Sequence, residues 1–249
     1  MSDIFSRNEL FWGKDVQSRL ADFSVAVFGL GGVGGYTAEM LTRAGVGNLI
    51  LIDFDTVSES NINRQIIALN STIGQSKTEL FKKRLLDINP DIKLKIISDF
   101  YTDNLEKIVF SSSVDFVADA IDTMRSKVSL LEYCYKNNIP IVSSMGAGNR
   151  VDPTKLYISD ISEIHNKKAP FVSNILYQLK KRNIEKGITV VTSDESPSVQ
   201  EKISEVEKIT SKSGEVIEFT KIIPSSTPFV ASTAGIFIAS YITERLIKQ

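Results

Sequence analysis

The sequence of 249 residues contains one cysteine, Cys134, and one histidine, His165. A single cysteine excludes an internal disulfide and zinc sites built from paired Cys-x-x-Cys motifs. With only one histidine as well, transition-metal catalysis is not expected. No apolar run approaches the ~20 residues that a membrane-spanning helix requires, and the polar N-terminus lacks the apolar core of a signal peptide. We therefore expect a cytoplasmic protein without membrane segments.

The chain also lacks an excess of charge of either sign. With 29 basic and 30 acidic residues its net charge is −1, so a nucleic-acid partner would need a local basic patch. One such cluster surrounds a predicted helix and comprises His165, Lys167, Lys168, Lys180, Lys181, Arg182 and Lys186. It could contact phosphates, and the alternative is an ordinary solvated helix face.

Strand and helix patterns alternate through the first half of the chain. Buried strands are predicted near residues 24–28, 48–53, 93–97, 115–121 and 140–144, with helices between them and an opening helix at 8–20. This alternation predicts an α/β fold: a Rossmann-like, doubly wound, mainly parallel sheet with helices on both faces. The remainder is predicted to be a less regular C-terminal extension that ends in a helix at 229–247.

A glycine turn follows the first predicted strand. Residues 29–34 read GLGGVG, a G-x-G-x-x-G between a strand and a helix. Gly29 permits a tight turn, Gly31 lets the backbone approach a phosphate, and Gly34 allows close helix–strand packing. Asp53 lies 19 residues after Gly34, where a carboxylate can accept hydrogen bonds from ribose. The pattern predicts a nucleotide site, and the alternative is a purely structural turn.

The segment after Asp53 indicates which nucleotide binds. It reads FDTVSESNINRQ, with GQSK further on, and places Asn61, Arg64 and Lys77 near one phosphate pocket. A dinucleotide has only two phosphates, whereas extra cations suit a triphosphate whose pyrophosphate leaves. This argues against a dehydrogenase. A nucleotide-binding module that does not turn over its ligand is kept as an alternative. Arg64 and Lys77 could instead be solvated surface charges.

This run of motifs resembles the adenylation domain of ubiquitin-activating-type enzymes and of sulfur-carrier adenylyltransferases, over residues of about 5–160. The resemblance implies that ATP and Mg²⁺ bind. The nucleotide site that it implies consists of Gly29, Gly31, Gly32, Gly34, Asp53, Asp55, Asn61, Arg64 and Lys77. It further implies that Asp122 holds magnesium and that Arg7 reaches across a homodimer interface into the partner's site. Asp122 could also be an N-cap of the helix at 125–137.

Sulfur-carrier and ubiquitin-like activators usually have two Cys-x-x-Cys pairs and a nucleophilic cysteine, and this chain can supply neither set. Cys134, in LEYCY, falls in the middle of a predicted helix. A buried structural cysteine is the expected role there. Thioester chemistry is therefore not expected.

Along its whole length the chain resembles the tRNA threonylcarbamoyladenosine dehydratases. The matching motifs are FSR at 5–7, AID at 120–122, GAG at 146–148, DPT at 152–154 and VVTSDE at 190–195. The resemblance implies ATP-dependent dehydration of threonylcarbamoyladenosine in tRNA through an adenylated carboxylate, releasing AMP and pyrophosphate. Its implied catalytic residues are Arg64, Lys77, Asp122 and Arg7. The alternative is an adenylyltransferase for a sulfur-carrier or ubiquitin-like protein.

Two further expectations concern organisation and partners. We expect a single adenylating domain over residues 1–249, with a nucleotide-binding core at about 20–160 and a substrate-facing part at about 161–249. Residues 194–216 are polar without an apolar face and are predicted to form a mobile loop. Some dehydratases keep a cysteine near the last helix as a link to a sulfur-relay protein, whereas residues 224–228 here read PSSTP.

Overall fold

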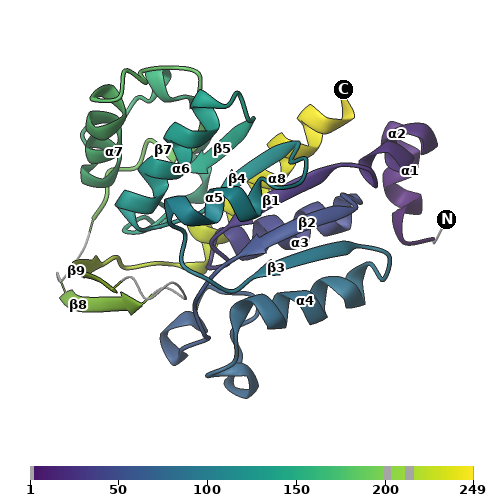
Figure 1. Ribbon diagram of the computed structural model, residues 1–249, viewed down its shortest axis with the longest axis horizontal. Helices are drawn as coiled ribbons and strands as arrows, with labels where there is room; N and C mark the ends of the chain where they lie inside the picture. The colour runs from purple at the N-terminus through teal and green to yellow at the C-terminus, as the bar shows by residue number, and fades with distance from the viewer. Residues whose placement is uncertain (1–2, 199–202, 211–215, 249) are drawn as a thin grey trace.

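A seven-stranded sheet lies at the centre of the computed structural model, which describes residues 3–198, 203–210 and 216–248 (Figure 1). The strand order is β3-β2-β1-β4-β5-β7-β6. Neighbouring strands pair in parallel, except that β6 runs antiparallel to β7. The strands are β1 Ser24–Phe28, β2 Asn48–Ile52, β3 Lys93–Ile97, β4 Phe116–Asp119, β5 Ile141–Ser144, β6 Leu156–Asp160 and β7 Thr189–Ser193. The predicted doubly wound α/β fold is confirmed.

Helices cover both faces of this sheet because successive strand residues point to opposite sides. In β1, Val25 and Val27 enter one core and Ala26 and Phe28 the other. The first core is completed by α3 Gly34–Ala44, α4 Lys77–Ile88 and α8 Pro228–Ile247, and the second by α5 Asp103–Val109, α6 Met124–Lys136 and α7 Pro170–Lys180. Short 3₁₀ turns occupy Asp3–Phe5, Glu59–Asn61, Asn70–Thr72, Pro153–Lys155 and Ile161–Glu163.

The C-terminal helix α8 packs against the start of α3. A Cβ on Gly235 would lie 2.3 Å from the Val33 carbonyl oxygen, so only glycine permits this approach. The Thr37 hydroxyl donates to the Gly235 carbonyl at 3.1 Å. The C-terminal helix α8 thereby contacts the first turn of α3, directly after the glycine turn. Among the described helices, none, α8 included, has the length and apolarity to cross a membrane.

The prediction of one helix at residues 8–20 is wrong in detail. The chain forms two helices, α1 Ser6–Trp12 and α2 Lys14–Leu20. Gly13 separates them with φ 87°, a left-handed conformation that a right-handed helix cannot include. The glycine therefore turns the chain between two short helices.

The prediction of a mobile loop at 194–216 is wrong for part of that range, because residues there form a strand. β8 Ile203–Thr210 pairs antiparallel with β9 Val216–Ile223, and this hairpin stands away from the main sheet (Figure 1). The apolar residues Ile203, Val206 and Ile209 recur every third position, so the two-residue alternation that indicates a strand is missing. Residues 199–202 and 211–215 lie outside the described ranges.

A fully buried ion pair joins three elements behind the sheet's carboxyl edge. Lys127 of α6 and Asp119 at the end of β4 are both 0% exposed, with Nζ and Oδ2 2.5 Å apart. The Ser143 hydroxyl of β5 donates to the same oxygen at 2.6 Å, and Lys127 Nζ donates to Ser143 Oγ at 3.1 Å. Since each buried charge is paired and hydrogen-bonded, its desolvation is compensated.

Removing one partner of this pair should destabilise the fold strongly. We expect Lys127→Met to lower the free energy of unfolding by about 3–5 kcal/mol, because Asp119 would remain buried and uncompensated. Lys136→Met is the matched control on the same helix. It breaks the exposed pair with Glu132 and should cost less than about 1 kcal/mol. Urea unfolding followed by circular dichroism measures both, and equal stabilities of the two variants would contradict the prediction.

Candidate active site

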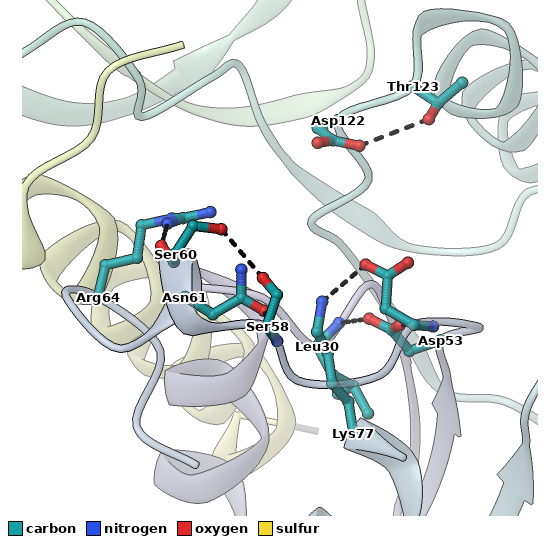
Figure 2. Close-up of polar contacts among 10 residues, drawn as sticks. Leu30, Asp53, Ser58, Ser60, Asn61, Arg64, Lys77, Asp122 and Thr123 are labelled. Atoms are coloured by element: carbon teal, nitrogen blue, oxygen red, sulfur yellow. Dashed lines mark hydrogen bonds and ion pairs between the residues drawn. The ribbon is translucent and has the colours of Figure 1, made fainter. Parts of the chain in front are cut away.

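A cavity of about 800 Å³ opens at the carboxyl ends of β1 and β4. These neighbouring strands mark the point where the strand order reverses, which is where open α/β sheets bind ligands. The sequence-predicted residues that line it are Gly29, Gly31, Gly32, Asp53, Asp55, Asn61, Arg64, Lys77 and Asp122. The fold thus brings together residues from the connections after β1, β2 and β4 (Figure 2).

The glycine turn has the predicted shape, with different tasks for its members. Gly29 has φ 83°. A Cβ on Gly34 would lie 1.8 Å from the Gly29 carbonyl oxygen, so Gly34 serves packing and is not among the residues that line the cavity. A Cβ on Gly32 would meet Arg64 and Ala231 at 3.2 Å. Around Gly31 the space is more open, which leaves its backbone accessible to a phosphate.

Asp53 fixes the turn from the end of β2. Its carboxylate accepts a hydrogen bond from the backbone N–H of Leu30 at 2.6 Å (Figure 2). It accepts a second one from the backbone N–H of Asp55 at 2.7 Å. Burial raises the pKa of Asp53, while Lys77 opposes that change. Carboxylate oxygens have further lone pairs, so Asp53 can still accept from a ribose hydroxyl.

Lys77 is buried, with a side chain only 5% exposed, and its Nζ lies 2.7 Å from Asp55 Oδ2. The alternative that Lys77 is a solvated surface charge is therefore wrong. It begins α4, where the Ser76 hydroxyl accepts from the Glu79 N–H as a helix cap. The ammonium group is thus held beside the cavity by a carboxylate that also lines it.

Arg64 is half-buried, and its Nη1 donates to the Ser60 carbonyl at 2.8 Å and to Asn63 Oδ1 at 3.0 Å. Burial lowers the pKa of Arg64, and the charge of Asp122 opposes that change. Asn61 is buried, and its Oδ1 accepts from the Ser58 N–H at 3.2 Å. These bonds fix the polar connection after β2 against the cavity.

Asp122 is exposed on the opposite wall of the cavity from Arg64 (Figure 2). Its Oδ1 accepts from the Thr123 hydroxyl at 3.4 Å. The alternative that Asp122 caps α6 is wrong, because the cap position is Thr123 and no side-chain cap bond forms there. Asp119 Oδ1 accepts from the Ile121 N–H at 3.0 Å, so the buried ion pair fixes the turn that presents Asp122.

Two predicted groups lie away from the cavity lining. Arg7 is on α1, and it is not among the residues that line the cavity of this chain. The basic cluster surrounds α7, where Arg182 pairs with Glu132 at 2.8 Å and Lys180 with Glu185 at 3.5 Å. His165 is exposed, with Nδ1 3.0 Å from Asp194 Oδ1.

Sequence reasoning missed several lining residues, namely Phe54, Gln65, Asp99, Phe100, Tyr101, Ser126, Ala147, Gly148, Pro224 and Ser226. Phe54 and Phe100 pack edge to face with ring centroids 5.1 Å apart. Gln65 follows Arg64 in the same motif, and its buried Oε1 has no hydrogen-bond partner in the part of the chain described. Phe54 and Gln65 lie in the same motif as Asp53 and Arg64, and Gly148 lies in the GAG motif, but nothing in those patterns indicated that their side chains or backbone line the cavity.

Cys134 is 0% exposed within α6. Burial raises the pKa of its thiol far above the ordinary value, so no thiolate forms near neutral pH. The expected role of a buried structural cysteine is confirmed. The cavity lining contains no cysteine, and any chemistry there must proceed without a thiol nucleophile.

The sheet, the glycine turn and the neighbouring cations define a protein that binds a nucleoside phosphate at the switch point of a Rossmann-like fold. The chain belongs to the ThiF family, whose model matches residues 5–244. The tRNA threonylcarbamoyladenosine dehydratase of Bacillus subtilis is 42% identical over 245 residues, which cover 98% of this chain and 95% of that protein.

Two further proteins are similar to this chain, one in structure and one in sequence. The structure of the E. coli tRNA N6-threonylcarbamoyladenosine dehydratase in complex with ATP has a TM-score of 0.84 at 28% identity and covers 99% of this chain and 94% of its own. The molybdopterin-synthase adenylyltransferase of Escherichia coli is 38% identical over 138 residues, which cover 55% of this chain and 54% of that protein. Similarity to the dehydratases therefore extends through the C-terminal extension, whereas the adenylyltransferase match covers about half the chain.

The inaccessible thiol gives a direct test of the site's chemistry. We expect iodoacetamide at pH 8 to leave native Cys134 unmodified, because the thiol is buried and protonated, and to alkylate it after unfolding in guanidinium. Mass spectrometry of the intact protein measures both states. Cys134→Ala should retain turnover, and rapid alkylation of the native protein together with loss of turnover in this variant would contradict the assignment.

Proposed function

We propose that this protein is an ATP-dependent dehydratase that cyclises threonylcarbamoyladenosine in tRNA through an adenylated carboxylate. The observation that carries the proposal is the similarity to the Bacillus subtilis dehydratase over 98% of the chain. The glycine turn, Asp53 and the cations Arg64 and Lys77 around one cavity support it. Because tRNA is its substrate, we place the enzyme in the cytoplasm.

The cavity residues divide the work of nucleotide binding. The backbone at Gly31 and Gly32 faces the phosphates, as at other helix N-termini, and Asp53 holds the ribose. The triphosphate side of the site consists of Asn61, Arg64 and Lys77. With Asp55 holding the Lys77 ammonium group beside the cavity, bound ATP can accept a charge-assisted hydrogen bond from it through a phosphate oxygen.

Asp122 is the residue that we propose for magnesium. Mg²⁺ is usually held by one or two carboxylates together with substrate phosphates, and an exposed carboxylate on the cavity wall fits that donor set. Magnesium would offset the charge that develops on the leaving pyrophosphate. The described residues contain no group of three or more His, Cys, Asp or Glu arranged for a metal ion.

The proposed reaction needs no thiol nucleophile, which agrees with the burial of Cys134. A threonine carboxylate oxygen attacks the α-phosphorus of ATP and pyrophosphate leaves. The neighbouring carbamoyl group then attacks the acyl carbon, loses a proton, and expels AMP with the carboxylate oxygen that would otherwise form water. Effective molarities of intramolecular attack reach about 10⁵ M or more. Positioning therefore replaces a covalent enzyme intermediate.

We also propose that the enzyme acts as a homodimer in which Arg7 enters the partner's cavity, and that tRNA contacts the basic cluster around α7. An aromatic side chain lies beside the cations of this cluster, because Lys181 Nζ is 4.3 Å from the ring centre of Tyr177. Aromatic rings and cations together suit unpaired bases and phosphates. A sulfur-relay partner is not part of this proposal, since residues 224–228 read PSSTP.

Mass analysis of the tRNA tests the activity. Incubation with ATP, Mg²⁺ and threonylcarbamoyl-modified tRNA should yield a nucleoside lighter by one water, with one AMP released per product. Arg64→Ala and Asp122→Ala should each lower kcat by about 10²–10³-fold, the usual loss when a group that stabilises developing charge is removed. Arg19→Ala and Asp91→Ala, exposed residues outside the cavity, are the controls. AMP formation only on addition of a diglycine-tailed carrier protein would assign the enzyme to the adenylyltransferases instead.

Subunit mixing tests the shared site. Arg7→Ala and Arg64→Ala should each be inactive alone. In a mixed dimer one cavity combines an intact Arg64 with an intact Arg7 from its neighbour, so random exchange should restore about a quarter of parental turnover. Mixing after mild denaturation and refolding allows this exchange. No recovery, when an affinity tag on one variant co-purifies the untagged other and so shows mixed dimers, would place Arg7 outside the partner's cavity.

A further inference from the structure

The cavity has two ends that differ in chemistry. In the sheet order β3-β2-β1-β4-β5, the glycine turn follows the middle strand. On the β2 and β3 side, Phe54 and Phe100 line the cavity, which suits a purine ring. On the β5 side the lining consists of Ala147, Gly148, Pro224 and Ser226. The nucleotide roles proposed above leave this second end unassigned.

The second end is closed by residues 224–227, here called the wall segment. Asn149, with φ 62°, holds it from the connection after β5. The Asn149 N–H donates to the Ser225 carbonyl at 2.7 Å, and Asn149 Oδ1 accepts from the Ser225 N–H at 2.8 Å and hydroxyl at 3.0 Å. Three bonds to one residue fix the wall segment against the Gly148 side of the cavity.

A fourth bond joins the wall segment to the phosphate side. Asn63 Nδ2 donates to the Ser226 carbonyl at 2.9 Å, while Asn63 Oδ1 accepts from Arg64 Nη1 at 3.0 Å. One amide therefore holds both the wall and the cation. A carboxylate bound at this end would lie close to the guanidinium of Arg64.

The size and charge of this end restrict its occupant. A Cβ on Gly148 would lie 2.7 Å from the Pro224 Cβ, so the missing side chain keeps the two walls from colliding. The four residues that line this end are uncharged. A neutral, hydrogen-bonding group that ends in a carboxylate directed toward Arg64 fits this environment, whereas a second phosphate does not.

We propose that the space between Gly148 and the wall segment binds the threonylcarbamoyl group of the modified adenosine and thereby determines substrate specificity. This inference rests on the proposed function. The urea part lies against Gly148 and the Ser226 hydroxyl, and the carboxylate points to the α-phosphate beside Arg64. The wall segment is then a specificity element, separate from the residues that hold ATP.

Two variants alter this end from opposite walls. Gly148→Ala adds a methyl group toward Pro224, and Ser226→Val replaces the hydroxyl at similar volume. Ser71→Val, an exposed serine outside the cavity, is the matched control. Filter binding with a non-hydrolysable ATP analogue measures the preference for threonylcarbamoyl-modified over unmodified tRNA, and calorimetry measures the ATP affinity.

Gly148→Ala should crowd this end, and Ser226→Val should remove one polar contact, so each variant should lose about tenfold of that preference. The Kd for ATP should stay within about twofold, because the residues that hold the nucleotide are unaltered. An unchanged preference in both variants, in an enzyme that dehydrates the modified tRNA, overturns the inference and leaves the proposed function standing. A parallel loss of ATP affinity also overturns it. A parent protein that neither prefers nor dehydrates the modified tRNA overturns both.

Discussion

The pairing of Lys127 with Asp119 is the constraint on which the cavity depends. A charge pair without solvent contact contributes little net stability compared with apolar residues of the same volume. Its value here is positional, because Asp119 Oδ1 holds the Ile121 N–H and Ser143 joins β5 to the same oxygen. One ion pair thereby fixes the relative positions of β4, β5 and α6. The turn that carries Asp122 follows β4, and the connection that contains Gly148 follows β5.

Both cationic side chains of the cavity lining are already held in place before a nucleotide binds. Lys77 is held by Asp55, and Arg64 by the Ser60 carbonyl and Asn63. Little reorganisation is therefore needed when phosphate arrives, which is the condition under which fixed charges stabilise a transition state most effectively. The uncharged end bordered by Gly148 contrasts with this region. The division suits a reaction in which one substrate is a polyanion and the other presents a single carboxylate.

The sequence was sufficient for the parts of the site that are local. The strand, glycine turn and helix of residues 24–44 form one continuous unit, and Asp53 follows at the end of the next strand, so spacing alone predicted their proximity. Phe100, Gly148 and Ser226 come from three separate connections, and no local pattern records that the topology brings them together. The hairpin of β8 and β9 was missed because pairing between strands, rather than apolar periodicity, defines it. The break at Gly13 was missed because a helical pattern continues on both sides of it.

The residues that flank the β8–β9 hairpin, Ser198 and Ser225, both form hydrogen bonds with Asn149. Asn149 accepts from the Ser198 N–H through its carbonyl and holds Ser225 through its side chain and N–H. Insertions are tolerated best where the two ends of a segment already meet. Descendants of this protein could therefore lengthen, shorten or replace the hairpin without disturbing the cavity. A single asparagine in this way separates the part of the enzyme that is free to diverge, and to acquire new binding partners, from the part that performs its chemistry.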